Sequence, residues 1–511
     1  MTSRVLGVVR EQVMAAYFGA GDATDAFNVA FRIPNLVRDL FAEGAMSSAF
    51  VPTFTRHLAT AGKDSAWRLG NFVINGLIVI TAGLVVLGIV FAEPLVEFFA
   101  GAYREVPGKM ELTVFLTRLM LPFLTFVAIA AAFMGMLNSL HHFFIPALSP
   151  AMFNVATIVC ALGLVPLMPA LGLPAITAIA IGALVGGAAQ LLLQWPSLRR
   201  EGFRYRPILQ WRDESFQRVL VLMGPGAIGL AATQINVLVN TVLATGEGTG
   251  AVSWLNYAFR LMYLPIGLFG VSIATATLPA VSRYVAMRDD HATRRTVADG
   301  LSLMLMLNIP ATVGLMVLAP SIVRLIFERG AFMAADTVAT AAAVQLYAIG
   351  LVGYSVVRIT SPVFYALGQN RTPVMVSVAT VLTNALLNIW LVGLMGYRGL
   401  ALGTSIAALL NAAALLFLLQ RRLGGIDGTR MASSLVRILL AAGVMGLAAV
   451  ATETAIGQWM PGAGLAPQLM RLTTTIGVAV GTLAASAYLL RVPEFRKAVS
   501  LVSRRLRVGS R

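Results

Sequence analysis

The chain has 511 residues, of which 58% are hydrophobic and only 12% are charged. A soluble globular domain carries about 25% charged residues, so the composition excludes that class and predicts a polytopic membrane protein. The formal net charge is +16, but the basic residues gather in alternate loops without a nucleic-acid recognition motif, so we expect no nucleic-acid partner.

Apolar segments occupy most of the chain, and a spanning helix needs about 20 mostly apolar residues. The first segment is short and weak, and the chain begins inside it, which leaves open a longer native N-terminus. We expect about fourteen transmembrane helices, near residues 1–20, 25–55, 70–92, 113–138, 145–169, 174–196, 217–244, 250–282, 301–323, 336–366, 373–395, 397–420, 434–456 and 468–490.

Loop charges predict the orientation of these helices. Arginines and lysines crowd the loops near 56–68, 199–218, 283–295 and 421–437 and the tail 491–511. The opposite loops hold few: Arg104, Lys109, Arg329 and Arg398. Basic loops face the cytoplasm, so both termini are expected there, in agreement with an even number of spans. The basic tail is expected to be solvated or to lie at the membrane lipid surface.

An internal repeat divides the chain. Three short patterns recur in order, with offsets of 260 − 32 = 228, 279 − 52 = 227 and 373 − 150 = 223 residues. The repeat unit holds six helices, so the two halves have the same orientation, and transporters with repeated halves bind substrate between them. We therefore expect an N-lobe at 1–203, a C-lobe at 214–422, two extra helices at 432–490 and a basic tail at 491–511.

Charged side chains lie inside several expected spans, where charge is costly unless it lines a cavity or is paired. The repeat makes Arg32 equivalent to Arg260, and both are expected to face a central cavity. The acids at this depth are expected only in the first two helices: Glu11, Asp25, Asp39 and Glu43. The predicted cavity is therefore net cationic, which favours an anionic substrate, and arginine suits phosphate through its planar fork.

Other roles for these charges stay open. Arg10 and Arg38 are also consistent with charges that extend to the membrane surface from helix ends. Arg118 and Arg358 are equally consistent with structural pairing.

The sequence contains no motif of a common catalytic or metal-binding site. The four histidines show no metal-ligand spacing, and no Walker or GxSxG motif occurs. Asp289-Asp290 resembles the metal-binding acids of prenyl-phosphate enzymes, but flanking arginines favour a solvated turn. We therefore expect a transporter rather than an enzyme, with no metal and no cofactor.

Motifs in the N-terminal residues and near residue 260 resemble those of a known family. Ser3-Arg4-Val5-Leu6-Gly7, Thr24-Asp25-Ala26-Phe27, Pro34-Asn35-Leu36 with Arg38, and Ala42-Glu43-Gly44-Ala45 through Val51-Pro52 are similar to the N-terminal signature of bacterial lipid II flippases, the MurJ/MviN family. Val252-Ser253-Trp254 through Arg260-Leu261-Met262 and Pro265 resembles the family's eighth helix.

The resemblance implies the fold of the multidrug/oligosaccharidyl-lipid/polysaccharide exporter superfamily. It implies alternating-access movement of lipid II, the undecaprenyl-pyrophosphate-linked peptidoglycan precursor, from the inner to the outer leaflet of the bacterial cytoplasmic membrane. The process belongs to peptidoglycan and cell wall biogenesis and so to cell shape, with cell-wall synthesis enzymes as expected partners. Helices 432–490 would form a groove for the lipid tail. The expected substrate-binding residues are Arg4, Arg10, Asp25, Arg32, Arg38 and Arg260, with Glu43, Asn35, Arg118 and Arg358 as a second set.

One departure and several rivals remain. Some family members carry an acid three residues after the eighth-helix arginine, where this chain has Tyr263. A multidrug antiporter of the same superfamily would want an acidic cavity. An exporter of another polyprenyl-linked glycan would share the cationic cavity and is disfavoured only by the N-terminal motif. A membrane enzyme acting on a polyprenyl phosphate and a non-transporting scaffold are the rivals from other classes.

Overall fold

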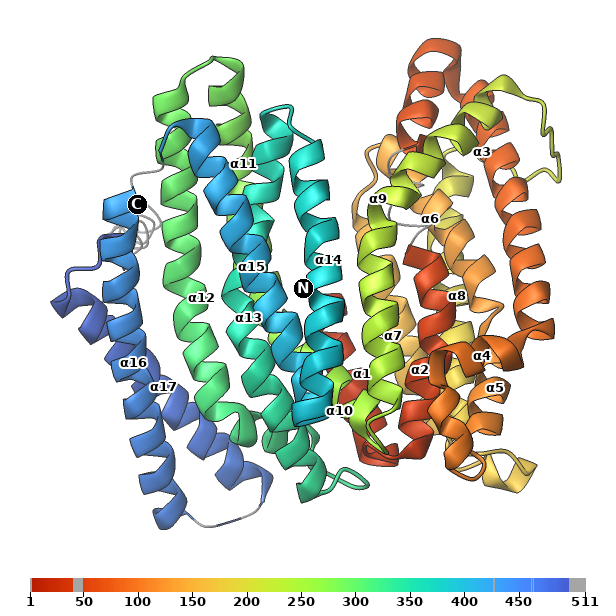
Figure 1. Cartoon of the computed structure of the whole chain (residues 1–511). Helices are drawn as coiled ribbons and strands as arrows, with labels where there is room; N and C mark the ends of the chain where they lie inside the picture. The colour runs from red at the N-terminus through yellow and green to blue at the C-terminus, as the bar shows by residue number, and fades with distance from the viewer. Residues whose placement is uncertain (1, 40–48, 426–427, 461, 463, 496–511) are drawn as a thin grey trace, which may run out of the picture. The chain divides into compact units, whose positions relative to one another are not determined.

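The structure is a computed structural model that describes residues 2–39, 49–425, 428–460, 462 and 464–495 (Figure 1). Every regular element within these ranges is helical, and none is a strand. The α-helices of the first half are α1 Thr2–Phe18, α2 Asp22–Arg38, α3 Val51–Val90, α4 Ala92–Ala100, α5 Lys109–Met120, α6 Phe123–Ser139, α7 Phe144–Leu164, α8 Thr177–Arg200 and α9 Glu214–Thr245. Those of the second half are α10 Ala251–Pro265, α11 Val271–Ala286, α12 Asp290–Phe327, α13 Ala334–Ala366, α14 Arg371–Met395, α15 Tyr397–Leu423, α16 Gly428–Trp459 and α17 Leu465–Leu489.

Each of the fourteen expected segments overlaps a helix. Within the described residues, eleven helices are long and apolar enough to cross a membrane, with α5–α6 and α10–α11 each counted as one. Helices α1 and α2 have only 17 residues each, and the described apolar part of α9 is the shorter stretch Gln234–Thr245. The all-α polytopic membrane class is therefore confirmed.

Two helices depart from regular geometry inside the chain's long apolar stretches. Helix α3 runs for 40 residues and breaks at Gly62, whose φ of 78° lies in the left-handed region that glycine adopts without steric cost. A π turn, Ile266–Gly270, joins α10 to α11 directly after Pro265, where proline removes a backbone donor. Both departures therefore occur at residue types that release the regular helical hydrogen-bond pattern.

The chain forms two compact units. Unit 1 comprises Met1–Ser253 together with Arg329–Met333, and unit 2 comprises the remaining residues from Trp254 onward. The short segment of unit 1 that follows α12 is held by the N–H of Ala331, which donates to the carbonyl of Ala16 at 2.9 Å. The repeat-based lobes 1–203 and 214–422 stay a prediction, because compactness does not test the symmetry that defines them.

Unit 1 has an aromatic core near one end of α3. Phe54, Trp67, Phe133 and Phe203 are buried together between α3, α6 and the segment after α8. The rings of Trp67 and Phe203 have centroids 5.4 Å apart, within the range of favourable aromatic pairing. A second cluster joins α1, α2, α5 and α8, and it positions the charged helices α1 and α2.

Unit 2 packs α11, α12, α13 and α15 around one apolar cluster, while α16 and α17 cover α12 through two smaller ones (Figure 1). Glu453 of α16 accepts hydrogen bonds from the hydroxyls of Ser321 on α12 and Thr475 on α17. The prediction that acids at membrane depth occur only in the first two helices is thus wrong, because Glu453 lies inside the expected span 434–456. Two hydroxyl donors satisfy this carboxylate in place of a cation.

Candidate functional site

The charges of the first helix are paired within unit 1. Arg10 forms an ion pair with its neighbour Glu11, and its guanidinium carbon lies 5.2 Å from the ring centroid of Phe153 on α7. Both charged side chains are largely buried. Pairing and a cation–π contact are the arrangements that make charge tolerable in an apolar setting. Arg4 lies on the same helix, but its side chain is outside the part that the structure describes.

A second paired charge lies at the end of α2. Arg38 donates from Nε and Nη2 to one oxygen of Asp39, at 2.9 and 2.6 Å, and Gln234 of α9 donates to the other oxygen at 3.4 Å. Arg32 is half-buried on the same helix. The amide nitrogen of Asn35 donates to a backbone carbonyl one turn earlier, at 2.8 Å. Glu43 lies outside the described residues.

Asp25 is the most completely enclosed of the predicted site residues whose side chains the structure describes, and it is 0% exposed. Its Oδ1 accepts from the backbone N–H of Ser253 at 3.0 Å and from the Ser253 hydroxyl at 2.6 Å. Its Oδ2 accepts from the N–H of Gly250 at 2.7 Å and from Lys109 Nζ at 3.1 Å. Four donors thus converge on one buried carboxylate, which satisfies its main hydrogen-bonding capacity.

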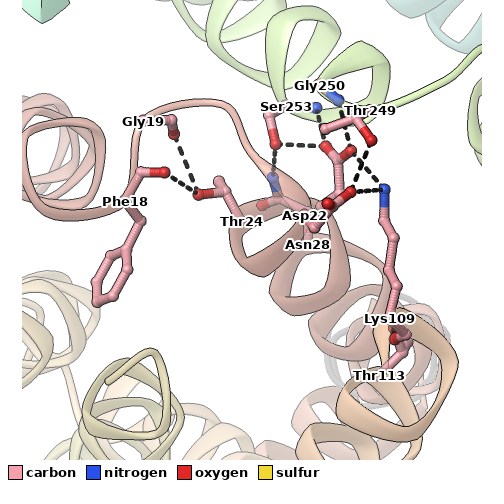
Figure 2. A network of polar contacts seen from close by, with 11 residues as sticks. Phe18, Gly19, Asp22, Thr24, Asn28, Lys109, Thr113, Thr249, Gly250 and Ser253 are labelled. Atoms are coloured by element: carbon pink, nitrogen blue, oxygen red, sulfur yellow. Dashed lines mark hydrogen bonds and ion pairs between the residues drawn. The ribbon is translucent and has the colours of Figure 1, made fainter. Parts of the chain in front are cut away.

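This node ties together α2, α5 and the start of α10. Lys109 at the beginning of α5 also pairs with Asp22 Oδ1 at 2.8 Å, and the Thr249 hydroxyl donates to the same oxygen at 2.7 Å (Figure 2). Lys109 Nζ lies 4.2 Å from the ring centroid of Tyr103. Asn28 on α2 donates to the Ser253 hydroxyl at 3.2 Å. Asp22, Asp25, Lys109, Thr249 and Ser253 are called the Asp25 node below.

Local sequence explains why the carboxylate sits there. Asp25 lies in the first turn of α2, and it also receives the free N–H groups at the start of α10. Unpaired N–H groups and the helix dipole make a helix N-terminus favourable for negative charge. Asp25 therefore stabilises two helix starts at once, and Lys109 compensates its charge.

In unit 2, the predicted arginines lie on α10 and α13. Arg260 is exposed on α10, inside the apolar stretch Ala251–Ala286. Arg358 is exposed on α13, and its Nη2 donates to the hydroxyl of Tyr263 at 2.6 Å. Tyr263 stands at the position where the resemblance to the family implies an acid in some members. The tyrosine hydroxyl therefore supplies an acceptor to arginine without adding a negative charge.

Arg118 and the Asp289-Asp290 pair make other contacts than the residues described above. Arg118 is exposed and donates from Nε to the carbonyl of Ile89 at 3.3 Å, within unit 1. Asp289 is used as a helix cap, because its Oδ1 accepts the N–H of Ala292 at 2.9 Å. In the described part of the chain, no three His, Cys, Asp or Glu side chains gather as metal ligands. The acid pair that a prenyl-phosphate enzyme would need is therefore committed to a structural role in one of its two members.

Comparison with known proteins now bears on these residues. A family model described as lipid II flippase MurJ matches residues 14–468. The chain belongs to the lipid II flippase MurJ family. The probable lipid II flippase MurJ of Vibrio cholerae serotype O1 is 34% identical over 505 residues, covering 96% of this chain and 94% of that protein.

Solved structures agree with the MurJ assignment. A lipid II flippase MurJ in an inward closed conformation matches with a TM-score of 0.78 at 27% identity, covering 96% of this chain and 97% of that chain. An inward-facing MATE multidrug resistance transporter of the MOP superfamily matches with a TM-score of 0.69 at 15% identity, covering 84% and 96%. The second match shows a shared fold alone. The MurJ family is one of transporters, and no catalytic activity is indicated.

Sequence reasoning within the MurJ family selected Asp25 but missed the residues that hold it. In the sequence, Lys109 is one of the few basic residues in the sparsely charged loops, and Ser253 is part of the eighth-helix motif. The signal for Lys109 is its scarcity: it is one of few cations in those loops and lies beside an apolar run. Arg32 belongs to unit 1 and Arg260 to unit 2, so the expectation that they face one cavity stays a prediction.

Proposed function

We propose that this chain moves lipid II from the inner to the outer leaflet of the bacterial cytoplasmic membrane by alternating access. The proposal rests on membership of the MurJ family over most of the chain. The observation that carries its mechanism is the exposure of Arg260 and Arg358 on apolar helices long enough to span a membrane. Charged side chains in such helices face a water-filled cavity or a polar ligand, because contact with lipid would be costly.

Arginine chemistry matches the headgroup of this substrate. The diphosphate of lipid II is anionic, and a guanidinium binds phosphate through paired hydrogen bonds. Arg32 and Arg38 on α2 would supply the contacts of the first half, and Arg260 those of the second. Arg358 would orient its neighbour Tyr263 or contact the headgroup itself. In this proposal the sugar and peptide fill the cavity while the prenyl chain stays in lipid along α16 and α17.

Membrane placement completes the proposal. Basic loops put both termini in the cytoplasm by the positive-inside rule. An inside-negative potential acts on charge with about 2.3 kcal/mol per elementary charge per 100 mV. After release of the anionic headgroup, this potential would draw the empty cationic cavity back toward its inward-facing state. Enzymes that make or use lipid II at the membrane are the expected partners.

A rescue experiment tests the proposal. The endogenous lipid II flippase is depleted from a bacterium that expresses this chain, and growth and outer-leaflet lipid II are measured. Arg260→Ala is compared with Arg283→Ala, a matched loss of an exposed arginine at the end of α11. We expect rescue by the parent chain and by Arg283→Ala, and failure of Arg260→Ala at equal membrane abundance.

Two results would count against different parts of the proposal. Failure of a well-expressed parent chain would shift support to export of another polyprenyl-linked glycan. Rescue by a charge-neutral variant of Arg32, Arg38 and Arg260 together, at the parent's level, would refute the electrostatic mechanism while leaving flipping in place.

A further inference from the structure

A small basic cavity lies within unit 2, where α12 begins and α15 ends. Its volume is about 180 Å³, and its lining consists of His291, Arg294, Arg295, Gly424 and Gly425. On the same measure, one water needs about 10–15 Å³, so the cavity has room for a polyatomic ligand. The described lining carries only basic side chains or none, which favours negative charge.

Arg294 is held in place but not saturated. Its Nε is buried and has no hydrogen-bond partner among the described residues. Its guanidinium lies directly against Gly424, where an added Cβ would be only 2.9 Å from Nη2. Gly424 ends α15 with a φ of 68°, in the left-handed region. Glycine therefore serves both the helix end and the close approach of arginine, and leaves a buried donor unused.

The internal repeat provides a comparison for this cavity. The offset 294 − 67 = 227 pairs Arg294 with Trp67, and 424 − 202 = 222 pairs Gly424 with Gly202, which follows the end of α8 and has a φ of 93°. The residue after each glycine makes the same backbone hydrogen bond, from Phe203 to Leu198 and from Gly425 to Gln420.

The two halves fill this shared position differently. In unit 1, Phe203 is 1% exposed and packs on Trp67, so an aromatic pair occupies the space beside the helix end. In unit 2, glycine replaces the phenylalanine and arginine replaces the tryptophan, and a cavity remains. An apolar plug in one half thus corresponds to an open basic pocket in the other.

We propose that the pocket of His291, Arg294 and Arg295 binds a phosphate group, a site independent of the proposed transport function. Two neighbouring guanidinium groups, one of which has a buried Nε without a partner among the described residues, match phosphate oxygens in charge and geometry. The nearby Asp289 accepts the N–H of Ala292 as the cap of α12, and among the described residues no ion pair joins it to Arg294 or Arg295. The ligand is a phosphate carried either by an anionic lipid headgroup or by a small soluble anion.

The experiment uses the purified full-length chain in nanodiscs and separates these two sources. In phosphatidylcholine nanodiscs, binding of inorganic phosphate is measured by calorimetry. In nanodiscs that also contain phosphatidylglycerol, retained anionic lipid is measured by native mass spectrometry. The test variant is Arg294→Gln with Arg295→Gln, and the matched control is Arg283→Gln, an exposed arginine outside the pocket. Arg294→Lys tests partial rescue, and thermal unfolding checks that each variant is folded.

We expect the double variant to weaken binding at least about tenfold, because it removes charge-assisted hydrogen bonds to the phosphate. Arg283→Gln should bind as the parent does. Loss of phosphate binding identifies a soluble anion, and loss of phosphatidylglycerol alone identifies a lipid headgroup. Equal binding by parent and double variant, or no binding of either probe by the parent, overturns the proposal. If the double variant does not fold, Arg295→Gln alone decides, because that side chain is exposed.

Discussion

The Asp25 node predicts a large loss of stability when its carboxylate is removed. Asp25→Ala would leave the ammonium of Lys109, whose side chain is 1% exposed, with only the half-exposed Asp22 as an anionic partner. It would also leave the N–H groups of Gly250 and Ser253 without their acceptor at the start of α10. Breaking a buried ion pair from one side costs about 3–5 kcal/mol, so we expect Asp25→Ala to fall in that range.

Conservative variants divide this loss into its parts. Asp25→Asn keeps an oxygen that can cap α10 and loses the charge, so we expect a smaller cost of about 1–3 kcal/mol. Lys109→Met leaves Asp25 with three donors from Gly250 and Ser253. Removing both partners of a pair leaves no uncompensated charge. The unfolding free energy lost by Asp25→Asn with Lys109→Met together should therefore be smaller than the sum of the two single losses, by about 0.5–3 kcal/mol.

The assay is equilibrium unfolding of the purified chain in detergent, followed by tryptophan fluorescence, with equal protein and detergent concentrations throughout. Arg104→Ala serves as a control because its ion pair with Glu97 is exposed and is expected to contribute little. Additive costs of Asp25→Asn and Lys109→Met, or a cost of Asp25→Ala equal to that of Arg104→Ala, would refute the reasoning.

Two further predictions concern unit 1. Gly330→Ala and Gly172→Ala both place alanine at positive φ, which costs about 1–2 kcal/mol. Gly330→Ala should cost more, because its Cβ would lie 2.1 Å from the carbonyl oxygen of Ala16, whereas a Cβ at Gly172 meets open space. Equal shifts of the thermal unfolding midpoint would contradict this. Hydrogen bonds from Lys63 and then His142 hold the pKa of Glu201 below its usual value. A carboxylate with a lowered folded-state pKa stabilises the fold fully above the unfolded-state pKa of about 4.3, and this stabilisation is lost as the pH falls through the folded-state pKa. Glu201→Gln should therefore cost at most about 1 kcal/mol of unfolding free energy at neutral pH and nothing in strong acid. Unfolding measured at both pH values checks this.

Apolar runs made the helices predictable, but not where they begin. Helix α3 starts at Val51 rather than near residue 70, and α12 starts at Asp290 rather than near 301. Both added segments are polar and helical, so hydropathy does not detect them. The start of α12 is set by Asp289, whose side chain caps the helix. The sequence predicted only a solvated turn at Asp289-Asp290.

The candidate site was predictable in its residue types and less so in its partners. Arg10, Asp25 and Arg38 stand out because charge is rare in apolar sequence. Their partners arise in two ways. Arg10 and Arg38 pair with the next residue, whereas Asp25 pairs with Lys109, 84 residues away, and with Ser253, 228 residues away. Pairing at such separation depends on how helices pack, and no local pattern in the sequence encodes it.

The same comparison separates two uses of charge in this chain. Asp25 is fully buried, and all four of its described contacts lie inside unit 1, so its negative charge stabilises helix starts. Arg260 and Arg358 are exposed on apolar helices, where contact of a charge with lipid is costly, so we expect them to face water or a polar ligand. Loss of Asp25 should therefore reduce stability and transport together. Loss of Arg260 should abolish transport while leaving the unfolding midpoint unchanged, and a matching fall in both quantities for Arg260→Ala would assign it a structural role.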